Sequence, residues 1–200
     1  VSCWDGSDWT LQARGVGSGV NGLASTPDGI WLAVWEDTPV ESRQGVLRLL
    51  AGNRVTREIE LEDGVPRFLA ARRDGGLVVT ALREDASGVT GGAVLAWSPE
   101  GRLERLEHAV DRPAGIAWGD EGTYVADDGS GDVLLLTPDG RRLIHAHDLH
   151  GASGLAVSAG GAVCVAEPGR SRIVCTPRAD AREGEHHEER GSQSQTDAGH

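Results

Sequence analysis

Short runs of apolar residues, separated by polar turns rich in glycine, recur along most of the chain. Runs of this length, bounded by Gly, Pro, Asp and Ser, are typical of β-strands. No window of about 12 residues keeps the i, i+3, i+4 apolar spacing of a helix without an intervening Gly or Pro. The pattern therefore predicts an all-β protein.

The runs are organised into a repeat. Four units begin near residues 20, 65, 112 and 152, and each contains a short strand, a glycine-centred turn and a second strand. The apolar residues Leu23, Leu69, Ile116 and Leu155 mark the same place in each unit and are spaced 46, 47 and 39 residues apart. This period matches one four-stranded blade of a β-propeller.

Further runs complete the blades. Third strands are expected at 46–50, 93–97, 133–136 and 173–175, and outer fourth strands at 57–61, 103–106 and 143–148. We therefore predict a partial β-propeller over residues 1–177, with about four four-stranded blades of a six-bladed ring. Residues 1–19 are interpreted as the remnant of a preceding blade whose inner strands are missing.

The two ends of this arc differ in character. Residues 178–200 are acidic and contain no apolar residue larger than alanine, which predicts a disordered acidic tail. An arc of four blades leaves an apolar sheet face open at each end. We expect missing blades or self-association to cover those faces.

Net charge limits the classes of partner. The formal charge of −12 excludes a nucleic-acid partner and does not suit an anionic membrane surface. No apolar run approaches the ~20 residues of a membrane span. We expect a soluble protein, whose compartment the sequence leaves open with the cytoplasm slightly favoured over secretion.

Two of the three cysteines, Cys164 and Cys175, lie in neighbouring predicted strands. A cross-strand disulfide and a pair of buried thiols both fit this placement. Because three cysteines are too few for a disulfide scaffold, we expect two buried thiols.

Two phrases in the repeat resemble a known group of propellers. NGLASTPDG at residues 21–29 and VPRFLAARRDGGLVVTAL at residues 65–82 are similar to the blade motif of calcium-dependent lactonases and esterases. That superfamily includes the senescence-marker-protein/gluconolactonase family, the arylesterases (paraoxonases) and the strictosidine-synthase-like proteins. The phrases VADDG at 125–129 and VAEPGRSRI at 165–173 also resemble NHL-repeat blades.

The resemblance implies a divalent cation on the propeller axis, held by Asn, Asp and Glu side chains where the innermost strands begin. Calcium suits such oxygen ligands, and the ion would polarise a lactone or ester carbonyl. The corresponding positions here are Asn21, Arg67, Ala114 and Ser153. Asn21 is the predicted metal ligand, whereas Arg67 and Ser153 are expected to contact a substrate.

Two of these positions depart from the family pattern. Arg67 stands where an Asp is expected, and a guanidinium cannot coordinate a metal. Ala114 stands where the catalytic Glu of strictosidine synthase would fall. The resemblance therefore implies a metal-dependent lactone or ester hydrolase with an eroded metal site. The alternative is a non-catalytic NHL-like or strictosidine-synthase-like propeller that binds a small molecule or a protein.

Other polar residues recur outside these positions. Glu36, Asp127 and Glu167 stand at the ends of second strands, where they could form an acidic cation-binding rim or cap turns and face solvent. We favour the second interpretation. His145 and His147 have the spacing of two metal ligands on one face of a strand. We expect them instead to mark an exposed outer strand.

Overall fold

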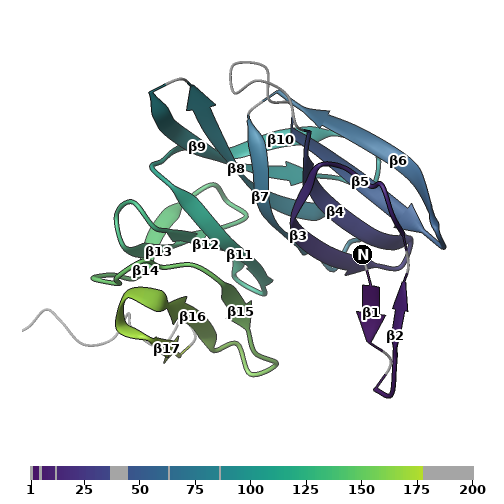
Figure 1. The fold of residues 1–200 in the computed structure, drawn as a ribbon. Helices are drawn as coiled ribbons and strands as arrows, with labels where there is room; N and C mark the ends of the chain where they lie inside the picture. The colour runs from purple at the N-terminus through teal and green to yellow at the C-terminus, as the bar shows by residue number, and fades with distance from the viewer. Residues whose placement is uncertain are drawn as a thin grey trace, which may run out of the picture.

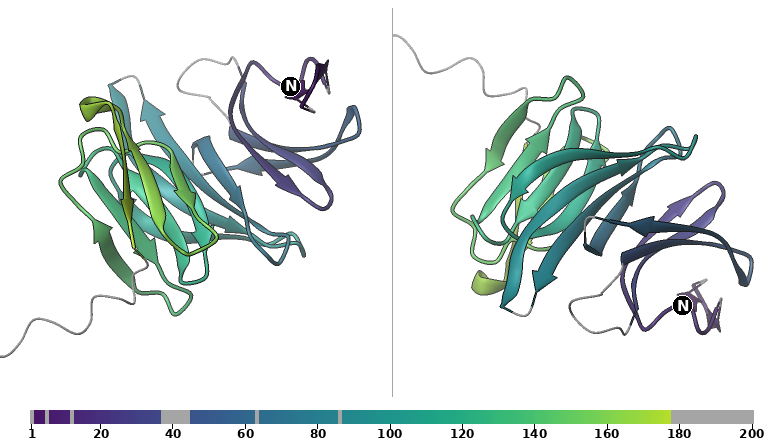
Figure 2. Two further views of the ribbon diagram at one scale, coloured as in Figure 1. Left: turned by 90° about the horizontal axis from the view of Figure 1, so that it is seen from below. Right: turned by 90° about the horizontal axis from the view of Figure 1, so that it is seen from above.

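The computed structural model describes residues 2–4, 6–11, 13–36, 45–62, 64–85 and 87–177. Within those ranges nearly every regular element is a β-strand, and one short 3-10 helix, η2 (Pro168–Arg170), interrupts the pattern. The predicted all-β class is confirmed. The strands form consecutive antiparallel sheets that follow one another in an open arc (Figure 1 and Figure 2).

We call the four larger sheets blades 1 to 4. Blade 1 contains β3 (Gly19–Thr26), β4 (Gly29–Trp35), β5 (Gly45–Ala51) and β6 (Arg54–Leu61). Blade 2 contains β7 (Val65–Ala71), β8 (Leu77–Asp85), β9 (Gly88–Trp97) and β10 (Leu103–Val110). Blade 3 contains β11 (Pro113–Gly119), β12 (Gly122–Asp127), β13 (Asp132–Leu136) and β14 (Arg142–Ala146).

Blade 4 contains three described strands, β15 (Leu155–Val157), β16 (Val163–Glu167) and β17 (Arg172–Thr176). A separate hairpin of β1 (Ser2–Trp4) and β2 (Trp9–Leu11) precedes blade 1 and projects from the rest of the molecule (Figure 1). Strands pair in chain order within every blade. The predicted acidic tail at 178–200 lies outside the described residues.

Two glycines show why the first two strands of a blade turn where they do. Gly29 and Gly122 join the first strand to the second in blades 1 and 3, with φ of +141° and +143°. A Cβ atom would lie 2.4 Å from the Leu50 carbonyl oxygen at Gly29 and 2.2 Å from the Leu136 carbonyl oxygen at Gly122. Only glycine combines this backbone conformation with so close an approach.

The core lies between the blades. Side chains alternate across each sheet, so every blade has a leading face toward the blade before it and a trailing face toward the blade after it. Trp31 on blade 1 contacts Trp97 on blade 2, with ring centroids 5.0 Å apart. Three apolar clusters fill the successive interfaces, built around Trp31, Leu47 and Leu95, then Val78, Val125 and Leu134, then Tyr124, Leu135 and Val165.

Cys164 and Cys175 form a disulfide, so the expectation of two buried thiols is wrong. The two residues are paired directly across β16 and β17, with Cα atoms 4.1 Å apart. Val163 and Val165 on β16 point to the core, so the alternating Cys164 points to the opposite face. Cys175 is exposed on that face. The two cysteines form a disulfide because the register of β16 and β17 places them directly opposite each other.

Candidate functional site

The innermost strands of blades 1 to 3 each carry an irregularity at the position that the repeat singled out. In β3 the pairing shifts between Val20 and Gly22, which leaves Asn21 as the extra residue of a β-bulge. In β7 the shift falls between Pro66 and Phe68, around Arg67. In β11 it falls between Pro113 and Ile116, around Ala114 and Gly115. Bulges re-aim side chains at the edges of sheets and beside active sites.

Ser153 occupies the matching place in blade 4. It lies just before β15, and its backbone N–H donates to the Ala166 carbonyl on β16 at 3.0 Å. We call Asn21, Arg67, Ala114 and Ser153 the inner positions. Asn21, Ala114 and Ser153 are half-buried, and Arg67 is exposed.

Hydrogen bonds connect the inner positions from blade to blade. The Asn21 side-chain amide donates to the Pro66 carbonyl at 2.9 Å, and the buried Thr80 hydroxyl donates to the Ala114 carbonyl at 2.8 Å. The Gly115 N–H donates to the Ser153 carbonyl at 2.9 Å. The four positions therefore follow one another along the inner edge of the arc.

The donor set of the inner positions does not fit a calcium centre. Calcium takes about six to eight oxygen ligands, whereas these side chains offer one amide, one hydroxyl and a guanidinium. A calcium ligand at Asn21 would be its amide oxygen, because the amide nitrogen donates to the Pro66 carbonyl on blade 2. Among the described residues, no three His, Cys, Asp or Glu side chains gather as a metal-binding group.

Asp127 caps a turn but does not face solvent. Its side chain is 2% exposed, and its Oδ1 accepts hydrogen bonds from the Arg112 and Gly129 N–H groups at 2.9 and 3.0 Å. Its Oδ2 accepts the Asp111 N–H at 3.1 Å. The carboxylate thus holds the loop that leads into β11.

Glu167 plays the same part in blade 4 and is fully enclosed. Its Oε1 accepts the His150 N–H at 2.8 Å and Arg170 Nη1 at 2.9 Å, and its Oε2 accepts Arg172 Nε. Burial raises the pKa of Glu167, but the hydrogen bonds from Arg172 and His150 and the charges of the two guanidiniums outweigh it. The pKa is therefore lowered, and the group stays ionised.

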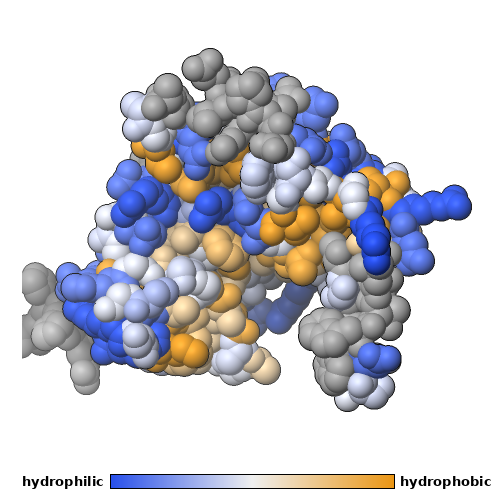
Figure 3. Space-filling view, in the orientation of Figure 1, coloured by the Kyte–Doolittle hydropathy of each residue, from blue (hydrophilic) through white to orange (hydrophobic). Residues whose placement is uncertain are grey.

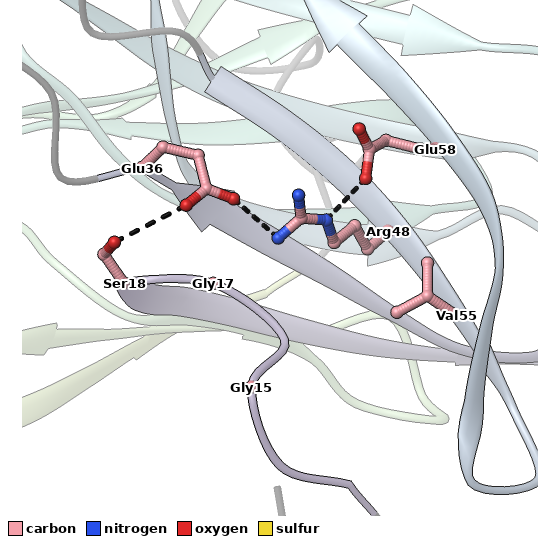
Figure 4. Close-up of a pocket in the computed structure, with 7 residues that line it drawn as sticks. All are labelled: Gly15, Gly17, Ser18, Glu36, Arg48, Val55 and Glu58. Atoms are coloured by element: carbon pink, nitrogen blue, oxygen red, sulfur yellow. Dashed lines mark hydrogen bonds and ion pairs between the residues drawn. The ribbon is translucent and has the colours of Figure 1, made fainter.

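Glu36 takes part in a charged cluster on the leading face of blade 1 (Figure 4). The Arg48 guanidinium lies 2.7 Å from Glu36 Oε1 and 2.6 Å from Glu58 Oε2, and its Nη1 donates to the Val16 carbonyl at 2.6 Å. Burial lowers the pKa of Arg48, but the two carboxylates more than reverse this. These residues border an open depression of about 530 Å³.

Sequence reasoning missed Arg48. The feature that could have revealed Arg48 is its charge within the apolar run VLRLL of residues 46–50. A single charge in such a run breaks the pattern of a fully buried strand. Because Arg48 is paired in register with Glu58 on β6, the break marks a cross-strand ion pair that supports blade 1.

The two histidines of the HAH run do not form a pair. His145 Nε2 bonds the Thr176 hydroxyl, and the ring packs edge-on against Tyr124 with centroids 5.0 Å apart. His147 lies beyond the end of β14, is exposed, and contacts Asp148 Oδ2 at 2.7 Å. The contacts of both histidines are structural. The bond from His145 to Thr176 connects blade 3 to blade 4.

Comparison with known proteins places the fold. A chain of a nidogen–laminin complex matches with a TM-score of 0.61 and 20% identity, over 78% of this chain and 60% of that one. A protein assigned as a gluconolactonase matches with a TM-score of 0.58 and 16% identity, over 79% and 60%. Virginiamycin B lyase from Staphylococcus aureus matches with a TM-score of 0.57 and 17% identity, over 81% and 56%.

These neighbours establish a β-propeller of about four blades and, at such low identity, the fold alone. The chain spans between 56% and 60% of their length. No protein-family model and no curated protein sequence matches the chain. In the part of the chain that the structure describes, no helix has the length and apolar character to cross a membrane.

Proposed function

We propose that this chain is part of a non-catalytic propeller that binds a small anionic molecule along the inner edge of the arc. The observation that carries the proposal is the composition of the inner positions. Arg67 presents an exposed guanidinium at the position where the resemblance to metal-dependent lactonases implies an acidic oxygen ligand. Arg67 and Ser153 are the proposed contacts.

The chemistry of Arg67 selects the class of ligand. A guanidinium presents a fixed fork of N–H donors that matches a carboxylate or a phosphate group. The hydroxyl of Ser153 is the proposed second donor on the same edge, where the Ser153 backbone bonds blades 3 and 4 through Gly115 and Ala166. Small carboxylates and phosphates are therefore the proposed ligands.

Binding to gluconate, citrate and inorganic phosphate, measured by titration calorimetry, tests this function. We expect Arg67→Gln to raise the dissociation constant of the anion by about tenfold or more, because a charge-assisted hydrogen bond is worth about 1.5 to 3 kcal/mol. Arg102→Gln serves as the matched control, since Arg102 is exposed at a turn between outer strands. No binding of any of the three probes, or equal loss in both variants, would contradict the proposal.

Calcium-dependent lactone or ester hydrolysis is the second candidate. Asn21 at the first inner position and the likeness to a protein assigned as a gluconolactonase favour it. Calcium would then raise the melting temperature by mass action, and lactone turnover would disappear with a chelator and in Asn21→Ala. That pair of results would replace the non-catalytic proposal.

We also propose an oxidising compartment, against the preference for the cytoplasm drawn from the sequence. The Cys164–Cys175 disulfide supports it, because cytosolic thiols are kept reduced. Differential alkylation of the protein taken directly from its cells tests this. Free Cys164 and Cys175 thiols would count against it.

A further inference from the structure

The trailing face of blade 4 repeats a pattern that is buried in the other three blades. Each trailing face is centred on two cross-strand pairs from the second and third strands. These pairs are Trp31–Leu49 and Ala33–Leu47 in blade 1, Val78–Ala96 and Thr80–Val94 in blade 2, Tyr124–Leu135 and Ala126–Val133 in blade 3, and Cys164–Cys175 and Ala166–Ile173 in blade 4. We call each set a trailing quartet.

Exposure separates the last quartet from the others. Ile173 is 72% exposed, whereas the residues at its position in blades 1 to 3, Leu47, Val94 and Val133, are at most 1% exposed. In each of those blades the next blade covers the quartet with its leading face. Ile173 thus keeps the apolar character of a buried position, although no sheet among the described residues covers it.

The other end of the arc, at blade 1, carries a leading face whose edge is exposed. On blade 1 the leading face is built on Leu32, Val34 and Leu50, which Ala13 and Val16 cover, with the Arg48 ion pairs beside them. Leu23, Val20 and Val55 are paired in register with those three residues and share their face. They are 55%, 39% and 42% exposed, and apolar surface gathers over β3 in Figure 3.

We propose that these two faces bind each other between copies of this chain. The trailing quartet of blade 4 packs on Leu23, Val20 and Val55 of a second copy, beside Ala13 and Val16, which already cover Leu32, Val34 and Leu50. Three interfaces within the molecule join a trailing face to a leading face, which supports a contact of the same polarity between copies. Because the faces differ, the contact is head-to-tail and leaves one free face of each kind on every dimer.

The driving force sets the salt dependence. Burial of apolar surface favours association, while two copies, each with a net charge of −12, repel each other. Salt screens that repulsion. Association should therefore strengthen as sodium chloride is raised, the reverse of an interface built on ion pairs.

Sedimentation velocity of the 200-residue chain over increasing concentration tests the proposal. The unmodified chain should form dimers and larger species, whereas Ile173→Asp and Leu23→Asp should each remain monomeric. Ile144→Asp is the control, because Ile144 is 64% exposed on the outer strand of blade 3 and belongs to neither face. Circular dichroism establishes that every variant is folded, and Ile173→Ser replaces Ile173→Asp if that variant is not.

Mixing the two monomeric variants gives the decisive result. Each keeps one intact face of the opposite kind, so an equimolar mixture of Ile173→Asp and Leu23→Asp should form a 1:1 dimer and nothing larger. A monomeric unmodified chain, an Ile173 variant that associates like the unmodified chain, or a mixture that stays monomeric would each overturn the proposal.

Discussion

At the scale of single residues, two buried carboxylates determine how the blades hold their own loops. Asp127 and Glu167 end the second strands of blades 3 and 4, and each accepts backbone N–H groups from the loop that leads into the first strand of the same blade. Glu167 adds two guanidiniums. An ionised carboxylate is enclosed at an acceptable cost only because it has these partners.

Low pH should reduce the stability of the folded protein partly through protonation of Glu167. Its pKa is lowered in the folded state, so its contribution to stability is complete above the usual glutamate pKa of about 4.3 and is lost as pH falls through the lower folded value. We expect Glu167→Gln to have a lower melting temperature than the parent at pH 7 and a smaller difference from it in acid. Thermal unfolding over a pH series measures both.

Asp139→Asn is the control for this pH series. Asp139 also has a lowered pKa, chiefly from its hydrogen bond with the Thr137 hydroxyl, but it is exposed at a turn. It should change the melting temperature much less at every pH. If Glu167→Gln and Asp139→Asn behave alike, the enclosed carboxylate is not a support of blade 4.

The close approach of the innermost strands should make Gly115 intolerant of any side chain. A Cβ atom there would lie 1.9 Å from the Ser153 carbonyl oxygen and 2.7 Å from the Leu155 nitrogen. We expect Gly115→Ala to lower the free energy of unfolding by about 2 to 3 kcal/mol. Denaturant titration measures it.

Gly154→Ala is the matched substitution in the segment just before β15, because nothing lies within 4 Å of its Cβ position. It should change the free energy of unfolding by less than about 0.5 kcal/mol. Equal effects of the two substitutions would mean that the strands separate easily at Gly115.

For single residues, the repeat predicted where a residue lies within its blade better than it predicted which groups surround that residue. Aligning the four units located the inner positions, and in three of the four units a β-bulge falls at that position. The enclosure of Glu167 was not predictable, because it depends on the loop around His150 folding back over the end of β16. The metal role predicted for Asn21 and the ligand contacts predicted for Arg67 and Ser153 remain predictions.

At the scale of elements, blade 4 is the unit that depends most on covalent support. It has three described strands, and the disulfide joins β16 to β17 on the face that no described blade covers. The strands themselves were predictable from apolar runs and turns. The disulfide was not, because pairing depends on which face of the sheet Cys164 and Cys175 share.

Removing the disulfide should destabilise the fold. The cysteines are 11 residues apart, and closing a loop of that size in the unfolded chain is worth about 3 kcal/mol. We expect the double substitution Cys164→Ser and Cys175→Ser to lower the free energy of unfolding by about that amount. A reducing agent should do the same to the parent and nothing to the double variant.

At the scale of the whole molecule, the extensive contacts between described blades join neighbours in the arc. Stability in such repeats is a sum of blade and interface contributions, so it varies along the chain. Blade 2 is packed on both faces, and its central strands β8 and β9 contain fully buried residues such as Val79 and Leu95. Blade 4 is packed on one face by described residues.

Hydrogen exchange should reveal this gradient. We expect backbone amides of β8 and β9 to exchange most slowly and those of β15 to β17 to exchange first, measured at low protein concentration by mass spectrometry. Uniform protection from β3 to β17 would show instead that the four blades open as one cooperative unit.

The carboxylates of Asp127 and Glu167 have a consequence for how such a chain can change over generations. Each bonds a loop of its own blade, so a duplicated blade-length segment carries its own loop-holding carboxylate with it. A gene copying error that adds or removes one whole segment would leave the remaining loops held as before. One that cuts blade 3 or blade 4 between its first and second strands would separate the loop from the carboxylate that holds it, so a whole segment of either blade is the unit that can be copied without losing this support.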